Sequence, residues 1–271
     1  MVTVAVAGGG SGIGLDIVQA VLDAKKHDVI VLSRSDQPHL SSQGADVRVV
    51  GYGSAEDVRE SLRGVHTVIS CIAAYGSNST TSELALLEAA KQAGVARFVP
   101  SEWNSDCYDV VDLYSGKGIV WKAVQSSGLE YTRFINGLWM NVFGPGCVRD
   151  EEEALGAYKG RPPFAIDLKA GTAIITGDAS QMVVISKTQD IGRFVAAALD
   201  LPKWEPESRI VGDRITFTEV AELAKSRCGR DIQIKVMPTE NLKGLLRGNM
   251  SSDERFYYQL LLAIATGRMD F

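Results

Sequence analysis

A glycine-rich segment directly after the first apolar run constrains the fold of this chain of 271 residues more than any other feature. Val2–Ala7 has the composition of a buried strand, and Leu15–Ala24 carries apolar residues at helical spacing. Between them the glycines are spaced as GxxxGxG, which lets the amides at a helix start approach a pyrophosphate. A glycine-rich turn that binds nothing is the alternative. The strand–loop–helix context favours a dinucleotide site, formed by Gly8, Gly10, Ser11, Gly12, Ile13 and Gly14.

Short β-branched runs alternate with helical patterns through the first half of the chain. The helix expected at Leu15–Ala24 leads into a strand at Val29–Leu32. Further strands are expected at Val47–Val50, Thr67–Ile72, Arg97–Val99 and Tyr131–Ile135, with helices at about Ala55–Arg63, Ser79–Ala93 and Gly118–Ser127. Strand–helix–strand repeats build parallel sheets with helices on both faces. With the glycine loop, they predict an α/β fold of Rossmann type, a doubly wound parallel sheet.

A second, smaller lobe is expected after this alternation ends. The rhythm breaks at Gly144-Pro145-Gly146, and the acidic run Asp150–Glu153 follows. We therefore expect a nucleotide-binding domain at residues 1–145 and a smaller mixed α/β substrate lobe at residues 146–271. Strand and helix patterns are mixed in this tail, and the segments near residues 182–200 are expected to return to the first domain.

The end of the second expected strand indicates which dinucleotide binds. The segment Leu32-Ser33-Arg34-Ser35 lies about twenty residues after Gly14. Chains that bind NAD usually place an acid here for the ribose 2′-hydroxyl, whereas an arginine suits the 2′-phosphate of NADP. Ser33 and Arg34 therefore predict NADPH or NADP+ as the cofactor. Asp36, two positions later, leaves NAD as an alternative.

Lys117 is the candidate catalytic residue. Val120 and Val124 follow it by three and seven residues, so all three share one stripe of the expected helix. A lysine directed inward near the strand ends is costly unless it is paired or used, and there it can bind the nicotinamide ribose, polarise a substrate oxygen or donate a proton. A lysine that reaches from the first turn into solvent is the alternative. Tyr114, three residues earlier, is a reserve candidate for the general acid.

Composition argues against several other classes of protein. The net charge is −5 and the 28 Lys and Arg residues form no basic block, so no nucleic-acid partner is expected. No apolar run has the length of a membrane span and no charged leader precedes the first strand, so a soluble cytoplasmic protein without membrane contact is expected. No metal site is expected either, because the cysteines lack CxxC spacing and pairing with histidine. We expect reduced, buried thiols at Cys71, Cys107, Cys147 and Cys228.

Several segments together resemble one known group, the atypical short-chain dehydrogenases of the NmrA-like and isoflavone-reductase-like family. The resemblance is carried by VAVAGGGSGIG, VLSR, RFVPSEWN, KGIVWKAVQSSGLEYT and NGLWMN. It covers about residues 1–145, with a weaker similarity in KTQDIGRFVAAAL at Lys187–Leu199. Ser11 departs from the pattern, because many members carry a glycine at that position.

The resemblance assigns roles to individual positions. It implies that Lys117 is the family's catalytic lysine and that Arg34 meets the 2′-phosphate. The segment PSEWN is similar to a family segment that lines the site, and a structural turn is the alternative. The substrate neighbours implied in this way are Ser101, Glu102 and Trp103. Residues expected to close an apolar pocket over the cofactor, unless they are ordinary core, are Trp139, Met140 and Phe143.

These features together predict an NADPH-dependent reductase. It would transfer hydride to a carbonyl, enone or benzylic carbon of a small aromatic or secondary-metabolite substrate. One alternative is a redox-sensing regulator that binds NADP and a protein partner without turnover, as some members of the family do. The presence of Lys117 favours the enzyme. A cofactor-assisted isomerase or cyclase in a biosynthetic pathway is the other alternative, and the oligomeric state stays open.

Overall fold

The computed structural model divides the chain into two compact units. The residues it describes are 1–52, 54–73, 79–147, 150–229 and 231–271. The first unit consists of Met1–Trp103, Gly116–Ile135 and Thr188–Arg209. The second unit consists of Asn104–Ser115, Asn136–Lys187 and Ile210–Phe271. The chain therefore passes between the units at several points, one of them at the start of the segment Thr188–Arg209.

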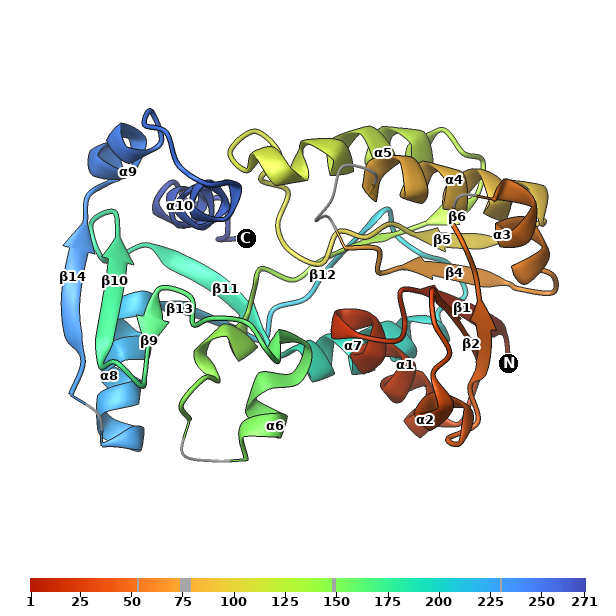
Figure 1. Cartoon of the computed structure of the whole chain (residues 1–271), viewed down its shortest axis with the longest axis horizontal. Coiled ribbons are helices and arrows are strands. Elements are labelled where there is room, and N and C mark those ends of the chain that lie inside the picture. Colours follow the sequence, from red (N-terminus) through yellow and green to blue (C-terminus); the bar gives the residue numbers. More distant parts are fainter. Residues whose placement is uncertain (53, 74–78, 148–149, 230) are drawn as a thin grey trace. The chain divides into compact units, whose positions relative to one another are not determined.

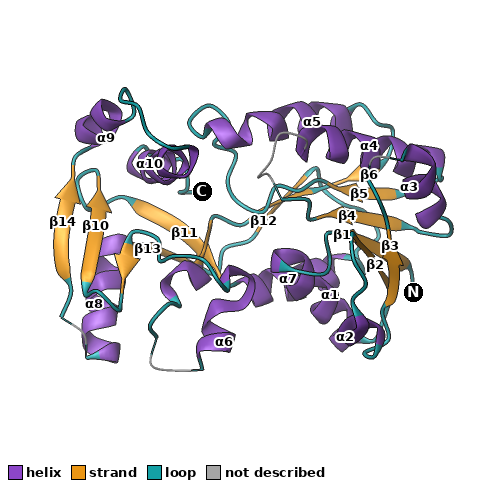
Figure 2. Ribbon diagram, in the orientation of Figure 1, coloured by secondary structure: helices purple, strands orange, loops and turns teal. Residues whose placement is uncertain are grey.

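A six-stranded parallel sheet forms the centre of the first unit (Figures 1 and 2). Its strands lie in the order β3-β2-β1-β4-β5-β6, and every neighbouring pair is parallel. This order confirms the predicted doubly wound fold. Strands are added on one side of β1 up to β3, and from β4 on they are added on the other side. The strands are β1 (Thr3–Ala7), β2 (Asp28–Ser33), β3 (Asp46–Val49), β4 (Thr67–Ser70), β5 (Arg97–Val99) and β6 (Glu130–Tyr131).

Helices cover both faces of this sheet because each buries one apolar stripe against it. In Figure 1, α3, α4 and α5 lie on one face, and α1 and α7 lie on the other. The close approach of α7 to α1 requires glycine at position 192, where a Cβ atom would stand 2.5 Å from the carbonyl oxygen of Asp16. The helices are α1 (Gly12–Ala24), α2 (Pro38–Ser41), α3 (Ala55–Ser61), α4 (Ser79–Gln92), α5 (Ser115–Gln125) and α7 (Thr188–Ala198).

The single strand predicted at Tyr131–Ile135 is two strands in the structure. β6 pairs with β5, whereas β7 (Arg133–Ile135) pairs in parallel with β12 (Glu207–Arg209). The returning segment makes this pairing possible, and the amide of Arg133 begins it by donating to the carbonyl of Pro206 at 3.0 Å. The sequence pattern of one strand cannot reveal a partner that lies more than seventy residues further on.

Arg97 ties the end of the sheet to the returning segment. Its side chain is 8% exposed and donates to Glu130 of β6 at 2.8 Å and to the carbonyl of Pro202 at 3.0 Å. The guanidinium also lies over the ring of Trp204, 4.7 Å from the ring centre, and the Trp204 amide donates to the same Glu130 carboxylate. Arg97 and the Trp204 amide therefore share one acceptor, the Glu130 carboxylate, which is one-third exposed, while Arg97 itself is almost completely shielded from water.

Replacing Arg97 with methionine should destabilise the first unit, because the Glu130 carboxylate would lose its buried cation. Since Glu130 is one-third exposed, we expect a loss on the order of 2 kcal/mol in the free energy of unfolding by urea. Arg63→Met removes a pair with Glu60 in which both side chains are mostly exposed, and should leave the urea midpoint almost unchanged. Equal losses of unfolding free energy in Arg97→Met and Arg63→Met would contradict the stabilising role of Arg97.

The second unit is built from two small mixed sheets. One has the order β14-β10-β9 and the other β13-β11-β8. Its strands are β8 (Leu138–Trp139), β9 (Ile166–Asp167), β10 (Thr172–Thr176), β11 (Met182–Ser186), β13 (Asp213–Thr216) and β14 (Gln233–Met237). Its helices are η1 (Asp112–Tyr114), η2 (Met140–Phe143), α6 (Glu151–Leu155), η3 (Gly156–Tyr158), α8 (Phe217–Cys228), α9 (Thr239–Leu245) and α10 (Ser252–Ala265). A mixed α/β character was predicted for this part of the chain.

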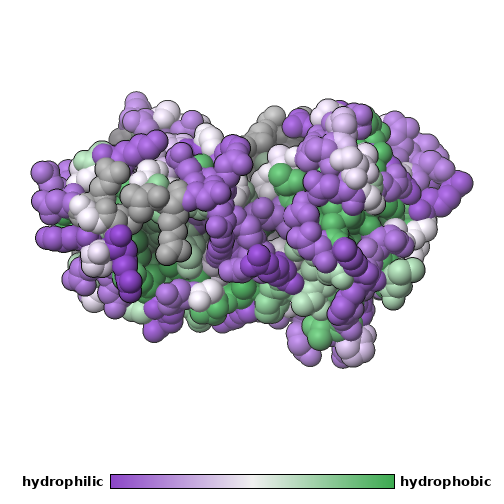
Figure 3. Space-filling view, turned by 90° about the horizontal axis from the view of Figure 1, so that it is seen from below, coloured by the Kyte–Doolittle hydropathy of each residue, from purple (hydrophilic) through white to green (hydrophobic). Residues whose placement is uncertain are grey.

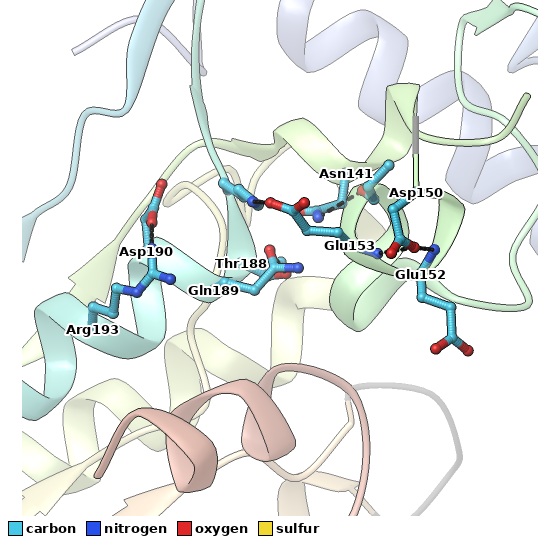
Figure 4. Close-up of polar contacts among 10 residues, drawn as sticks. Asn141, Asp150, Glu152, Glu153, Thr188, Gln189, Asp190 and Arg193 are labelled. Carbon is cyan, nitrogen blue, oxygen red and sulfur yellow. Dashed lines mark hydrogen bonds and ion pairs between the residues drawn. The ribbon is translucent and has the colours of Figure 1, made fainter. Parts of the chain in front are cut away.

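The start of α6 shows how local capping shapes the second unit. The Asp150 side chain accepts hydrogen bonds from the amides of Glu152 and Glu153, as an N-cap residue does (Figure 4). Glu153 in turn pairs with Lys187 at 2.9 Å, and the buried Asn141 donates to the carbonyl of Ala154 at 2.9 Å. These contacts attach the helix to the end of β11 and to η2.

One face of the molecule is mostly polar (Figure 3), and the cysteines differ in how far they are buried. The face shown in Figure 3 is mostly hydrophilic, with separate apolar patches. None of the helices in the described parts of the chain has the length and apolar character to cross a bilayer. Cys107 is buried as expected, but Cys71 and Cys147 are partly exposed residues, because the chain approaches the surface after β4 and η2. The thiol of Cys71 itself is shielded from water, which raises its pKa. The side chain of Cys228 lies outside the described residues.

Candidate cofactor site

The glycine loop lies at the carboxyl end of β1, in the first unit. Gly8 has a φ of +79°, and its amide donates to the carbonyl of Leu32 in β2 at 2.9 Å. A Cβ atom at Gly8 would lie 2.8 Å from the carbonyl oxygen of Cys71, which follows β4. The loop thus runs between the ends of two neighbouring strands with backbone against backbone. Only glycine combines this φ with this approach.

The start of α1 presents its amides beyond the loop. Ser11 is the N-cap residue in an extended conformation, and its side chain makes no capping hydrogen bond. The first amides of a helix have no partner within it, so in this helix they remain available to an anion. At Gly12 a Cβ atom would meet open space, whereas at Gly14 it would lie 2.4 Å from the carbonyl oxygen of Gly8. Ile13 buries its side chain, so only its amide can serve the predicted site.

The end of β2 places the predicted specificity residues beside the loop. Ser33 is buried, while Arg34 is exposed and makes no hydrogen bond or ion pair with any other residue in the described ranges. Gln37 was not predicted: its amide nitrogen lies 3.3 Å from the hydroxyls of Ser33 and Ser35. Its side chain also stands over Gly10, where a Cβ atom would lie 2.8 Å from it. Gln37 therefore closes one side of the loop.

Tyr52 is a second residue that the sequence reasoning missed. Its hydroxyl is buried and faces the Gly8 amide without the geometry of a hydrogen bond. Burial, and to a lesser extent Cys71, raise the pKa of Tyr52 to about 12. The signal available in the sequence was an aromatic residue just beyond the third strand, where parallel strands end at the ligand edge of such a sheet.

Lys117 lies in the first turn of α5 and points into the first unit. The helix starts at Ser115 rather than at the predicted Gly118, because η1 leads directly into it. Val120 and Val124 are fully buried on the same stripe. The ammonium of Lys117 donates to the carbonyl oxygens of Ser101 and of Glu102, the latter at 2.7 Å. The alternative of a lysine extended into solvent does not describe this side chain.

The segment Ser101–Trp103 follows β5, and its side chains form hydrogen bonds to the chain at the end of β4. All three residues are buried. The Ser101 hydroxyl donates to the carbonyl of Ile72 at 2.8 Å, and the Trp103 indole donates to the carbonyl of Ser70 at 2.9 Å. Trp103 also stacks on Phe134, with ring centres 5.7 Å apart. These contacts give Ser101 and Trp103 the structural role that was the alternative to their prediction as substrate neighbours, while their contact with a substrate stays a prediction.

Glu83 of α4 is a buried carboxyl group that the sequence reasoning did not single out. It is 5% exposed and lies on the inward face one turn before Leu86 and Leu87. Its carboxylate accepts from the Ser101 amide at 2.5 Å. Burial raises the pKa of Glu83 to about 7, although the Ser101 amide and the nearby Lys117 charge act in the opposite direction. An acidic residue in an apolar helical stripe was the available signal.

The remaining predicted site residues belong to the second unit. Tyr114 is buried in η1, its hydroxyl lies 3.1 Å from the Asn104 side-chain amide, and its ring meets Phe256 edge-on. Trp139, Met140 and Phe143 are half-buried, and Phe143 packs edge-on against Phe217. Their expected positions beside a substrate, and the role of Tyr114 as an acid, stay predictions.

Two relatives of this chain are named as an oxidoreductase and a reductase. Oxidoreductase BOA1 of Botryotinia fuckeliana is 36% identical over 233 residues, which cover 83% of this chain and 75% of that protein. Phenylcoumaran benzylic ether reductase PT1 of Pinus taeda is 25% identical over 253 residues, which cover 86% of this chain and 77% of that protein.

A solved structure supports the fold, and a family model covers nearly the whole chain. The binary complex of leucoanthocyanidin reductase with NADPH from Vitis vinifera has a TM-score of 0.79 at 19% identity, over 99% of this chain and 89% of that one. The model of the NmrA-like family matches residues 2–261. With the glycine loop at the end of β1 and the parallel sheet in the order expected for a dinucleotide fold, the chain belongs to the NmrA-like family.

Proposed function

We propose that this protein is an NADPH-dependent reductase that transfers hydride to a small aromatic or secondary-metabolite substrate. The observation that carries the proposal is the placement of two groups at one edge of one sheet. The glycine loop follows β1, and the carbonyls that hold Lys117 follow β5, at the carboxyl ends of parallel strands. Ligands of doubly wound sheets bind at this edge.

The cofactor assignment rests on the loop and on Arg34. The open amides at the start of α1 suit the diphosphate, since the backbone contacts at Gly8 and Gly14 leave no room for side chains there. The exposed Arg34 guanidinium suits the 2′-phosphate as a planar pair of donors. Asp36, the acid that left NAD as an alternative, accepts the backbone amide of Gln37 at 2.8 Å. NADPH is therefore the cofactor we assign.

Lys117 is the residue assigned to the reaction. Bound NADPH would supply a hydride from its reduced nicotinamide. The carbonyls of Ser101 and Glu102 fix the ammonium in one place, where it can hold the nicotinamide ribose and stabilise the negative charge that develops on a substrate oxygen. A proton from this ammonium, or from Tyr114 as the reserve acid, would complete a carbonyl reduction. Substrates with a carbonyl, enone or benzylic carbon fit this chemistry, and the reductases compared above are named for a phenylcoumaran benzylic ether and for leucoanthocyanidin.

The proposal is tested by following NADPH consumption with a panel of aromatic ketones, enones and benzylic ethers, with products identified by mass spectrometry. Turnover of at least one class, with one reduced product formed per NADPH consumed, is expected. Tight NADPH binding without any product would instead identify a sensor. A rearranged product without net NADPH consumption would identify an isomerase or cyclase.

Replacing Arg34 with alanine should weaken NADPH binding and leave NADH binding almost unchanged. A charge-assisted bond to the 2′-phosphate contributes about 1.5–3 kcal/mol, so the Kd for NADPH should rise by roughly 10- to 100-fold. Both constants can be measured by the fluorescence of the reduced nicotinamide. Arg193→Ala, an exposed arginine on α7 of the same unit, should change neither. An unchanged NADPH preference in Arg34→Ala would remove the role assigned to this residue.

A further inference from the structure

We propose that Glu83 is a positioning residue for Lys117: its carboxyl group fixes the Ser101 peptide that binds the ammonium, and its ionised form supplies a buried counter-charge. The inference rests on the proposed function, because it concerns the same lysine. It adds a group on α4 that controls whether this lysine is held in its working position.

A short relay through Ser101 connects the two side chains. The Glu83 carboxylate accepts from the Ser101 amide, and the Ser101 carbonyl accepts from the Lys117 ammonium. Three elements therefore meet at one residue: α4 supplies the carboxyl group, α5 supplies the ammonium, and the chain after β5 lies between them. A change in the position of the Glu83 carboxyl group would therefore move the Ser101 carbonyl to which the Lys117 ammonium is hydrogen-bonded.

A buried carboxyl group at position 83 can act in two ways: as a hydrogen-bond acceptor for the Ser101 amide, and as a negative charge. A neutral amide would also accept the Ser101 amide, so anchoring the peptide does not require a charge. A carboxylate at 5% exposure carries a desolvation cost that an amide avoids. A nearby cation can offset this cost by attraction to the carboxylate. The cation that interacts with Glu83 in this way is Lys117.

The polar and charged groups that act on Glu83 lie on α5 and on the chain segments at the ends of β4 and β5. Lys117 on α5 favours the ionised form, Glu102 after β5 disfavours it, and the Cys71 thiol after β4 is itself raised in pKa by burial and by Glu83. The Ser70 hydroxyl lowers the pKa of Glu83 but lacks the geometry of a hydrogen bond to it. With the pKa of Glu83 at about 7, the charge beside the relay changes within the physiological range of pH.

The first test measures the coupling of the two groups and needs no substrate. The Glu83 carboxyl carbon is followed by 13C NMR against pH in the wild-type protein and in Lys117→Met, and Glu83→Gln identifies the signal. We expect a midpoint near 7 in the wild type and a clearly higher midpoint in Lys117→Met, because the lysine charge favours ionisation. An unchanged midpoint would overturn the proposal whether or not the protein is a reductase.

The second test asks whether the charge matters for the reaction. With a substrate found in the panel, wild-type kcat should rise with pH as Glu83 ionises. Glu83→Gln should lose this rise and turn over roughly 10-fold more slowly at about pH 8, with little change in the KM of the substrate. Glu88→Gln, an exposed position on the same helix, should keep the wild-type profile. A Glu83→Gln variant with the wild-type profile would assign Glu83 a purely structural role and overturn the proposal.

Thermal unfolding confirms that the glutamine variant is folded and gives an independent check on the charge. Burial holds the pKa of Glu83 above its unfolded value, so the native carboxyl group binds more protons than the unfolded one between about pH 4.5 and pH 7. Wild-type stability should therefore fall as the pH rises through this window. Glu83→Gln should gain stability relative to the wild type over the same window, and a constant difference would contradict a buried titrating carboxyl group.

Discussion

NADPH binding should be lost when Gly14 is replaced with alanine. The added Cβ atom would stand 2.4 Å from the carbonyl oxygen of Gly8, a contact between two backbone segments that no rotamer change can relieve. Either the start of α1 or the loop at Gly8 must move, and the amides that we assign to the diphosphate move with it. If these amides bind the diphosphate as we propose, several hydrogen bonds to a charged group are lost together, and we expect the Kd for NADPH to rise by roughly 100-fold or more.

A titration of NADPH fluorescence measures this loss, and circular dichroism verifies that the variant is folded. Overpacking of this kind costs about 1–3 kcal/mol of stability, which a folded domain can tolerate. Gly244→Ala is the matched control, since a Cβ atom there meets nothing within 4 Å and the residue lies in the helix α9. Affinity for NADPH within about threefold of the wild type in Gly14→Ala would exclude the loop as the diphosphate site.

Turnover should fall by roughly 10²- to 10⁴-fold when Lys117 is replaced with alanine, the range typical of a lost general acid or electrostatic contact. Stability should fall much less, by roughly 1–3 kcal/mol for each of the carbonyls of Ser101 and Glu102 that is left without its donor. The measurement is kcat and KM with the substrate found in the panel, next to the Kd for NADPH. A large loss in kcat with a modest loss in NADPH affinity is the expected pattern.

Lys122→Ala is the control for this substitution. Lys122 lies on the same helix, is exposed, and faces away from the stripe of Val120 and Val124. Its removal should leave kcat, KM and NADPH affinity near the wild-type values. Near-wild-type turnover in Lys117→Ala would remove the lysine from the mechanism, and the sensor would then become the better assignment if NADPH still binds.

The fold of the first unit was largely predictable because its signals are local. The glycine loop, the apolar helical stripe of α1 and the β-branched runs each depend on neighbours within a few residues. The pairing of β7 with β12 was not predictable in this way, since it depends on a segment that returns after the chain has visited the second unit. The sequence pattern indicated that the segments near residues 182–200 return to the first domain, but not which strand they would pair with.

The candidate site shows the same difference residue by residue. Lys117 and Arg34 could be proposed from the sequence, because Lys117 shares a helical stripe with Val120 and Val124 and Arg34 follows the second strand. Gln37, Tyr52 and Glu83 were missed, because their significance lies in what they touch: the face of Gly10, the Gly8 amide and the Ser101 amide. None of these contacts joins residues that are neighbours in the sequence.

By itself, the sequence determined the dinucleotide turn, the parallel sheet that carries it and the lysine near the ends of its strands, because periodicity and glycine spacing are properties of short segments. Only the tertiary structure decided that a carboxyl group from α4 and an ammonium from α5 share the peptide of Ser101. The physical reason is that the energy of a charged group depends on how much water and which partners surround it. Both are set only when elements distant in the sequence pack together.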